Sequence, residues 1–239
     1  MTEDDISPFE TFREYFDSNG SLGADDSDAI VTRGAVAVKK GVRFPKGKLP
    51  VRFAETGTFE VVMAGLKTLE GCPRDVRGNF DASLNPIDSL EGGPVSVGDA
   101  YNVSNCKNLT SLRGAPQFVN NAFIATQCNL SHFHELAHSK IDRLVLTQNP
   151  ITSLLGIPTN CYNLRVDYHA QLPLLRVVLP NFPKLILRPP TSDQEDAVEY
   201  VRALIFFYWN KGIAAAVPMA RELIRMGLRG NAVWEKDLP

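Results

Sequence analysis

The sequence has few cysteines, no long apolar run and almost no net charge. Four cysteines in 239 residues are too few for the disulfide framework of a secreted domain, so we expect a reducing compartment. No apolar run reaches the roughly 18 residues of a membrane span. The acidic N-terminus lacks the apolar core of a secretion signal, and a formal net charge of −2 favours neither nucleic acid nor membrane as a partner. We therefore expect a cytoplasmic protein without a membrane partner.

Signatures of catalysis are also scarce. The sequence contains no phosphate-binding loop, no G-x-G-x-x-G and no nucleophile in a recognised context. The exception is His134-Glu135-Leu136-Ala137-His138, which matches H-E-x-x-H, where two histidines one helical turn apart bind zinc and the glutamate is the general base. Taken alone, the motif predicts a zinc-dependent hydrolase that uses His134, Glu135 and His138, and we keep that function as an alternative.

The sequence does contain a repeat. Four segments share a leading leucine, a glycine and a proline, and their leucines are 21, 22 and 42 residues apart: Leu69–Pro73, Leu90–Pro94, Leu112–Pro116 and Leu154–Pro158. The gap of 42 residues equals two repeats, with Phe133 at its midpoint. A period of about 20–29 residues is typical of leucine-rich repeats, and this one lies at the short end.

Alternating apolar residues, followed by Asn or Cys and a further apolar residue, separate these segments. The alternating pair predicts a short strand with both side chains inward, and stacked units should pair these strands into a parallel sheet. We expect at least five such strands, centred near Phe80, Tyr101, Phe123, Leu144 and Leu164. The Asn or Cys that ends each strand should form a buried column that satisfies backbone groups, made of Asn85, Cys106, Cys128 and Asn149.

The ends of such a stack need cover. Ser7 to Phe16 has the pattern of a short amphipathic helix, and irregular strands should follow it. After Pro189-Pro190 we expect helices over about 193–210 and 213–227, with Pro218 either starting or kinking the second. The predicted organisation is an N-terminal cap (1–58), a solenoid (59–190) and a helical cap (191–239). The fold class is thus an α/β repeat, a short-period leucine-rich-repeat solenoid with a parallel β-sheet.

The Leu-Glu-Gly-x-Pro-x-x-Val units, together with the C-terminal Arg221-Glu222-Leu223-Ile224-Arg225-Met226-Gly227-Leu228, resemble the leucine-rich-repeat-like proteins encoded by tailed bacteriophages. The resemblance covers residues 59–235. It implies a phage-encoded accessory protein in the host cytoplasm, with no catalytic residues to carry over.

The repeat register favours a second interpretation of the H-E-x-x-H motif. Residues 134–138 occupy the outer turn that holds Gly and Pro in the other units, whereas a zinc hydrolase needs the motif inside a long helix. We therefore predict no helix and no stoichiometric metal there, although His132 enlarges the local cluster. Cys106 and Cys128 are explained by stacking alone. No catalytic residue, metal ligand or cofactor is expected.

The predicted function is a non-catalytic protein-interaction module that binds a host protein. Residues alternating with the inward pair must point outward, one per rung, and the β-branched Ile124 and Val145 beside Arg165 resemble an interface core. The proposed contact residues are Asp81, Asn102, Ile124, Val145, Arg165 and Ile186, with Glu60 continuing the row. A homo-oligomer remains open.

A third function would use the basic stretch of the N-terminal region. Seven cations and no acid lie within residues 33–52, and such a stretch can contact phosphates. It leaves a virion or nucleic-acid-associated structural protein as a less favoured alternative, with contacts from Arg33, Lys39, Lys40, Arg43, Lys46, Lys48 and Arg52.

Overall fold

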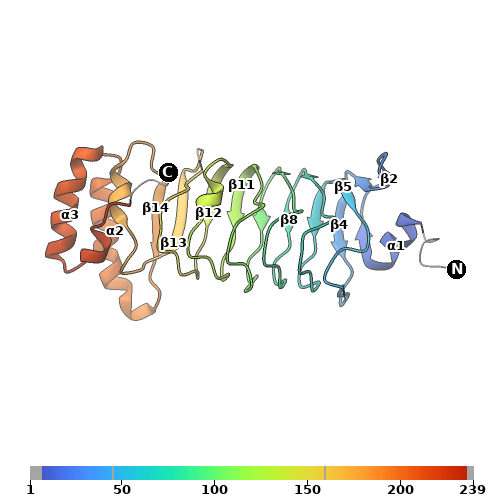
Figure 1. Ribbon diagram of the computed structural model, residues 1–239, viewed down its shortest axis with the longest axis horizontal. Coiled ribbons are helices and arrows are strands. Elements are labelled where there is room, and N and C mark those ends of the chain that lie inside the picture. The colour runs from blue at the N-terminus through green and yellow to red at the C-terminus, as the bar shows by residue number, and fades with distance from the viewer. Residues whose placement is uncertain (1–6, 45, 159, 236–239) are drawn as a thin grey trace.

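The chain forms an elongated solenoid. A computed structural model describes residues 7–44, 46–158 and 160–235, and shows a parallel-sheet β-solenoid of about 7 turns with helices at both ends (Figure 1). The predicted parallel sheet is therefore confirmed. Within the described residues, no helix has both the length and the apolar character needed to cross a membrane.

Two ladders of parallel strands run along the stack. The first contains β3 (Ile30–Thr32), β5 (Phe53–Thr56), β7 (Asp75–Val76), β9 (Ser96–Val97) and the start of β11 (Phe118–Ile124) and of β12 (Lys140–Val145). The second contains β4 (Ala35–Val38), β6 (Thr58–Glu60), β8 (Phe80–Asp81), β10 (Tyr101–Asn102), the ends of β11 and β12, β13 (Asn163–Asp167) and β14 (Lys184–Arg188). A register shift between Val119 and Ala122 marks the corner between the ladders within β11.

The predicted strand centres lie in one register. Phe80, Tyr101, Phe123, Leu144 and Leu164 face one another in successive strands. Inside the stack, the rings of Phe59, Phe80, Tyr101 and Phe123 are stacked in sequence, with centroids 6.0, 4.8 and 5.1 Å apart. Buried aromatic pairs of this kind add to the free energy of area burial, so this column fixes the register as well as filling the core.

The Asn/Cys column is also confirmed. The residue before each member has a positive φ, and the chain leaves the strand at that point. These preceding residues are Leu84, Asn105, Gln127 and Gln148. Asn85, Cys106 and Asn149 are buried, and Cys128 is half-buried. The Asn85 amide donates to the carbonyl of Val61 in the preceding turn, and its oxygen accepts from the backbone N–H of Leu66. The column therefore satisfies backbone groups at the level where the strand ladder stops.

Replacing Asn149 with alanine should lower the free energy of unfolding by about 3 kcal/mol, because several buried backbone groups lose their partner. The amide nitrogen donates to the carbonyls of Ala125 (2.7 Å), Leu146 (3.0 Å) and Thr147 (3.3 Å), and the oxygen accepts from the N–H of Leu130 (3.1 Å). Urea unfolding followed by circular dichroism measures the change.

Two further variants bracket that result. Asn149→Cys introduces the residue that two other turns have at this position, and it should lower the free energy of unfolding by less than alanine does. The reason is that a thiol at the equivalent position, Cys106, donates to a backbone carbonyl. The exposed Asn129 is the matched control, and its change to alanine should have almost no effect. Equal losses at residues 149 and 129 would contradict the structural role of the column.

Four of the outer turns are held by glycine, and the turn at residues 133–137 differs from them. Gly71, Gly92, Gly114 and Gly156 all have φ between +80° and +88°. In the exceptional turn Glu135 takes the glycine slot, and the chain forms a single 3₁₀ turn, η2 (His134–Leu136). No α-helix forms there, as predicted, because η2 is a single 3₁₀ turn of three residues. A glutamate avoids positive φ, so a 3₁₀ turn replaces the left-handed one.

At the front, α1 (Pro8–Tyr15) is capped by the Ser7 hydroxyl and buries Phe12, which confirms the predicted helix. β1 (Phe16–Ser18) and β2 (Leu22–Ala24) pair antiparallel with β4 and β3. The parallel pairing already includes β3 and β4, so the stack begins before residue 59.

At the back, η3 (Leu174–Val178) and η4 (Ser192–Gln194) precede α2 (Glu195–Tyr208), followed by η5 (Ile213–Ala215), α3 (Ala216–Arg225) and η6 (Arg229–Asn231). Both predicted helices are present, and α2 packs on β14. Pro218 neither starts α3 nor lies in its interior. It is the third residue of the helix, where the missing N–H has no intrahelical acceptor.

Candidate partner-binding surface

The outward side chains of the second ladder form one row, as predicted. Backbone pairing joins its members rung to rung, in the order Glu60, Asp81, Asn102, Ile124, Val145, Arg165 and Ile186. Glu60 and Arg165 are exposed and the others are half-buried. We call this set the outer row. The alternation of a strand fixes the orientation of all seven side chains.

The first half of the outer row is occupied by internal hydrogen bonds. The Asn102 amide donates to Asp81 Oδ2 at 3.0 Å. The other oxygen of Asp81, Oδ1, accepts the N–H of Ser83, and the amide oxygen of Asn102 accepts the N–H of Ser104. Asp81 and Asn102 thus stabilise the strand ends and bridge two rungs. Their predicted contact with a partner stays a prediction.

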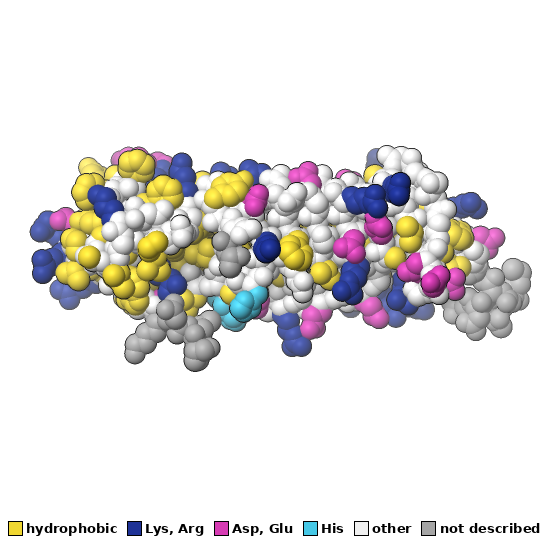
Figure 2. Space-filling model, turned by 90° about the horizontal axis from the view of Figure 1, so that it is seen from above, with side chains coloured by type: hydrophobic (Ala, Val, Ile, Leu, Met, Phe, Trp, Pro, Cys, Tyr) yellow, Lys and Arg dark blue, Asp and Glu magenta, His cyan; other side chains and the backbone are white. Residues whose placement is uncertain are grey.

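The second half of the row is apolar and leads into a groove. Ile124 and Val145 lie on adjacent rungs. Ile186 lines a groove of about 790 Å³ between β14 and α2, together with Ala203, Phe206 and Trp209. Phe206 has 78% of its surface exposed. In Figure 2, hydrophobic side chains gather at the helical end of the molecule, which fits an apolar groove there.

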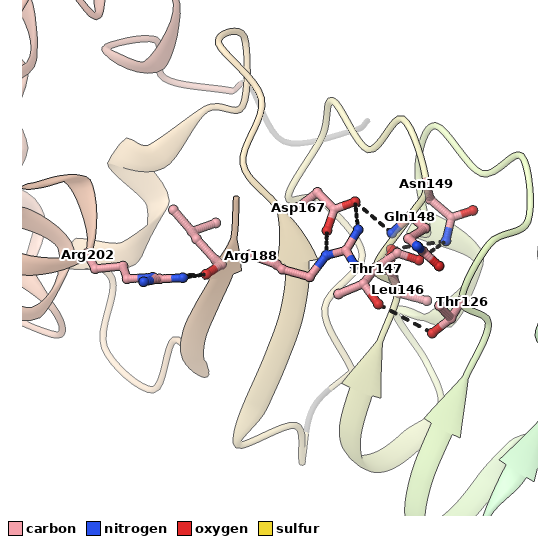
Figure 3. A network of polar contacts seen from close by, with 9 residues as sticks. Thr126, Leu146, Thr147, Gln148, Asn149, Asp167, Arg188 and Arg202 are labelled. Atoms are coloured by element: carbon pink, nitrogen blue, oxygen red, sulfur yellow. Dashed lines mark hydrogen bonds and ion pairs between the residues drawn. The ribbon is translucent and has the colours of Figure 1, made fainter. Parts of the chain in front are cut away.

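The charges around the groove are partly neutralised. Asp167 accepts from Arg188 Nε (2.6 Å) and Nη2 (3.1 Å) and from the N–H of Gln148 (2.7 Å; Figure 3). Its hydrogen bonds raise the pKa of Arg188. Arg202 pairs with two glutamates of α2 and donates to the Leu187 carbonyl, which ties α2 to β14 (Figure 3).

Two exposed cations lie beside the groove. Arg165 and Lys184 are exposed, and neither forms an ion pair with any residue in the part of the chain that the structure describes. Arg165 precedes Ile186 in the outer row, and Lys184 lines the groove itself. The surface therefore combines an apolar strip with unneutralised positive charge.

The H-E-x-x-H motif does not assemble as a zinc-hydrolase site. An α-helix would place His134 and His138 on one face, but η2 spans only His134–Leu136. The donor atoms that do converge belong to His132, His134 and Glu135, within 4.8 Å of one another. Sequence reasoning noted His132 as a neighbour but missed this set, because the motif directs attention to His138.

The cysteines offer no reactive nucleophile. All four are free. Burial raises the pKa of Cys106 to about 12 and that of Cys161 to about 11, and it also raises the pKa of Cys72 and Cys128. Thiols react as thiolates, so these side chains are poor nucleophiles at neutral pH.

The basic N-terminal stretch lacks an aromatic platform. Phe44 and Phe53, which interleave its cations in sequence, are both only 4% exposed. They belong to a core cluster with Phe16. Stacking on exposed aromatic rings is the usual way to hold unpaired bases, so contact with nucleic acid there would depend on phosphate charge alone.

Comparison with known proteins identifies no relative. No family model, no curated protein and no solved structure matches the chain. The surface must therefore be interpreted from its own geometry.

Proposed function

We propose that this chain is a non-catalytic protein-interaction module of the leucine-rich-repeat type, which binds a partner protein through the outer row and the groove beside α2. One observation carries the proposal: the apolar rungs Ile124 and Val145 and the lining residue Ile186 lie in one row that ends in the groove. Solenoids commonly use such an extended face for binding.

The occupant that fits this surface is an apolar segment of a partner protein that also carries carboxylates. Apolar side chains would cover the β-branched rungs and enter the groove beside Phe206 and Trp209. Carboxylates would pair with Arg165 and Lys184, which form no ion pair with the residues that the structure describes. Desolvated apolar anchors with charge at the rim are the usual composition of an interface.

The biological setting rests on the resemblance to phage-encoded proteins. It supports an accessory factor that acts in the host cytoplasm on a host protein. The alternative of a zinc hydrolase is less favoured, since His138 lies outside the converging donors. The alternative of a virion or nucleic-acid-associated protein is also less favoured, because the aromatic residues of the basic stretch are buried.

Replacing Ile124 and Val145 together with aspartate should weaken partner binding by about 2 kcal/mol or more, because the change puts charge into the apolar strip. The first measurement identifies a partner captured by the native chain from host cells. The affinity of the purified partner for native and variant chains then gives the effect. A change of about 2 kcal/mol corresponds to roughly a thirtyfold rise in the dissociation constant.

The matched control is Phe118→Asp. Phe118 belongs to the same strand as Ile124 and is 44% exposed, but it lies on the first ladder, away from the outer row. Its replacement should leave the affinity unchanged. A folded double variant with native affinity would refute binding through the outer row, and a loss confined to Phe118→Asp would move the interface to the first ladder.

A further inference from the structure

The turn at residues 132–135 departs from its neighbours in a way that the fold does not require. In four other turns a Ser or Thr hydroxyl accepts the N–H two residues further on, at Thr68, Ser89, Ser111 and Ser153. Three residues after each stands a glycine with positive φ. Here the Ser slot holds His132 and the Gly slot holds Glu135. Stacking alone explains Ser and Gly but not these replacements.

The replacements bring donor atoms together. His132 Nδ1 lies 3.5 Å from Glu135 Oε2. Both atoms are buried and within ion-pair distance of each other, but neither forms a hydrogen bond with any residue that the structure describes. The two side chains as a whole are partly accessible. The His134 ring is stacked on His132, with centroids 4.2 Å apart. Buried polar atoms without a hydrogen bond are uncommon in folded proteins, and a third species that binds both atoms would satisfy them together.

A divalent metal ion fits this arrangement. Donors bound at about 2.1 Å in a tetrahedral site lie about 3.4 Å apart, close to the observed 3.5 Å. Two imidazoles and a carboxylate match the preference of zinc. Ser111 Oγ donates to Glu135 Oε1 at 2.7 Å, which orients the carboxylate and leaves Oε2 for the metal.

We propose that His132, His134 and Glu135 form a binding site for Zn²⁺, with the remaining coordination position open to water or to a donor from a bound partner. His138 is not a ligand. This set replaces the expectation of no stoichiometric metal, which considered the His134–His138 pair.

The test is direct titration of the full chain with Zn²⁺ after removal of metal by a chelator. Calorimetry should show one ion per chain, and Co²⁺ should give the intense visible absorption of a four-coordinate site. His132→Ser restores the residue of the other turns, so it should keep the fold while weakening Zn²⁺ binding at least tenfold. Circular dichroism checks the fold, and Glu135→Gln should weaken binding similarly.

His138→Ala is the matched control and should bind Zn²⁺ like the native chain. Weaker binding in the His132 variant with native binding in the His138 variant supports the site. Absence of saturable binding, or equal binding by the native and His132→Ser chains, would overturn it. Loss of Zn²⁺ binding in His138→Ala, with Zn²⁺ binding retained in His132→Ser, would also overturn it. That result would instead indicate that the ligands are those of the H-E-x-x-H motif.

Discussion

Replacing Gly156 with alanine should lower the free energy of unfolding by about 2–5 kcal/mol, the sum of left-handed strain and overpacking. Gly156 has φ of +83°. A Cβ there would clash with the Cα of His134 and lie 2.8 Å from its C and N atoms. The obstacle is backbone of the preceding turn, which cannot rotate away as a flexible side chain could. The two turns would have to separate, and the loss should appear in urea unfolding.

Gly212→Ala is the matched comparison. Gly212 has nearly the same φ, +85°, but nothing lies within 4 Å of the position of its Cβ. Only conformational strain applies there, of about 1–2 kcal/mol. The difference between the two variants isolates the contribution of turn stacking. Equal losses would mean that the stacked turns relax without cost, contrary to the tight packing that the repeat implies.

The second ladder was predictable because its signal is local. Inward residues alternate within each unit and recur at the repeat spacing, so Phe80, Tyr101 and Phe123 determine both strand and register. The same alternation places the outer row. For a sheet with one buried face, a shift of one residue would expose the core, and the pattern therefore allows one register only.

The first ladder was not predicted, because β7 and β9 each contribute a single buried apolar residue, Val76 and Val97, so the sequence around them shows no alternating pair. A signal was nevertheless present. Val76, Val97, Val119 and Ile141 recur at the repeat spacing and are all buried. Aligning the repeats by column, rather than searching for strands within each unit, would have revealed this second set of inward residues.

The groove and the metal ligands depend on packing that the sequence does not display. The groove exists because α2 lies against β14, and Arg202 holds it there through the Leu187 carbonyl. No local pattern in β14 indicates that contact. The approach of His132 to Glu135 is likewise not visible in the sequence, because His132 lies two residues before η2 and reaches Glu135 across its N-cap, Phe133.

Replacing Val201 with aspartate should detach α2 from the stack. Val201 is 1% exposed, and it lies with Val198 and Ile205 on the buried side of the helix. A buried carboxylate without a partner is very costly, so we expect a loss of several kcal/mol or release of the helix. Tyr200→Asp, one residue away and 71% exposed in the native chain, is the control and should leave stability unchanged.

Release of α2 would uncover the last strand of the solenoid. Among the strands that the structure describes, β14 pairs only with β13, and release of α2 would also remove Arg202 from the Leu187 carbonyl. An uncovered edge strand pairs readily with further chains. We therefore expect Val201→Asp to form large assemblies in size-exclusion chromatography. Deletion of residues 191–239 should have a larger effect and give insoluble protein, while Tyr200→Asp elutes like the native chain. A folded truncated chain that elutes as one species would show that β14 needs no cover, and the C-terminal helices would then serve only to form the groove.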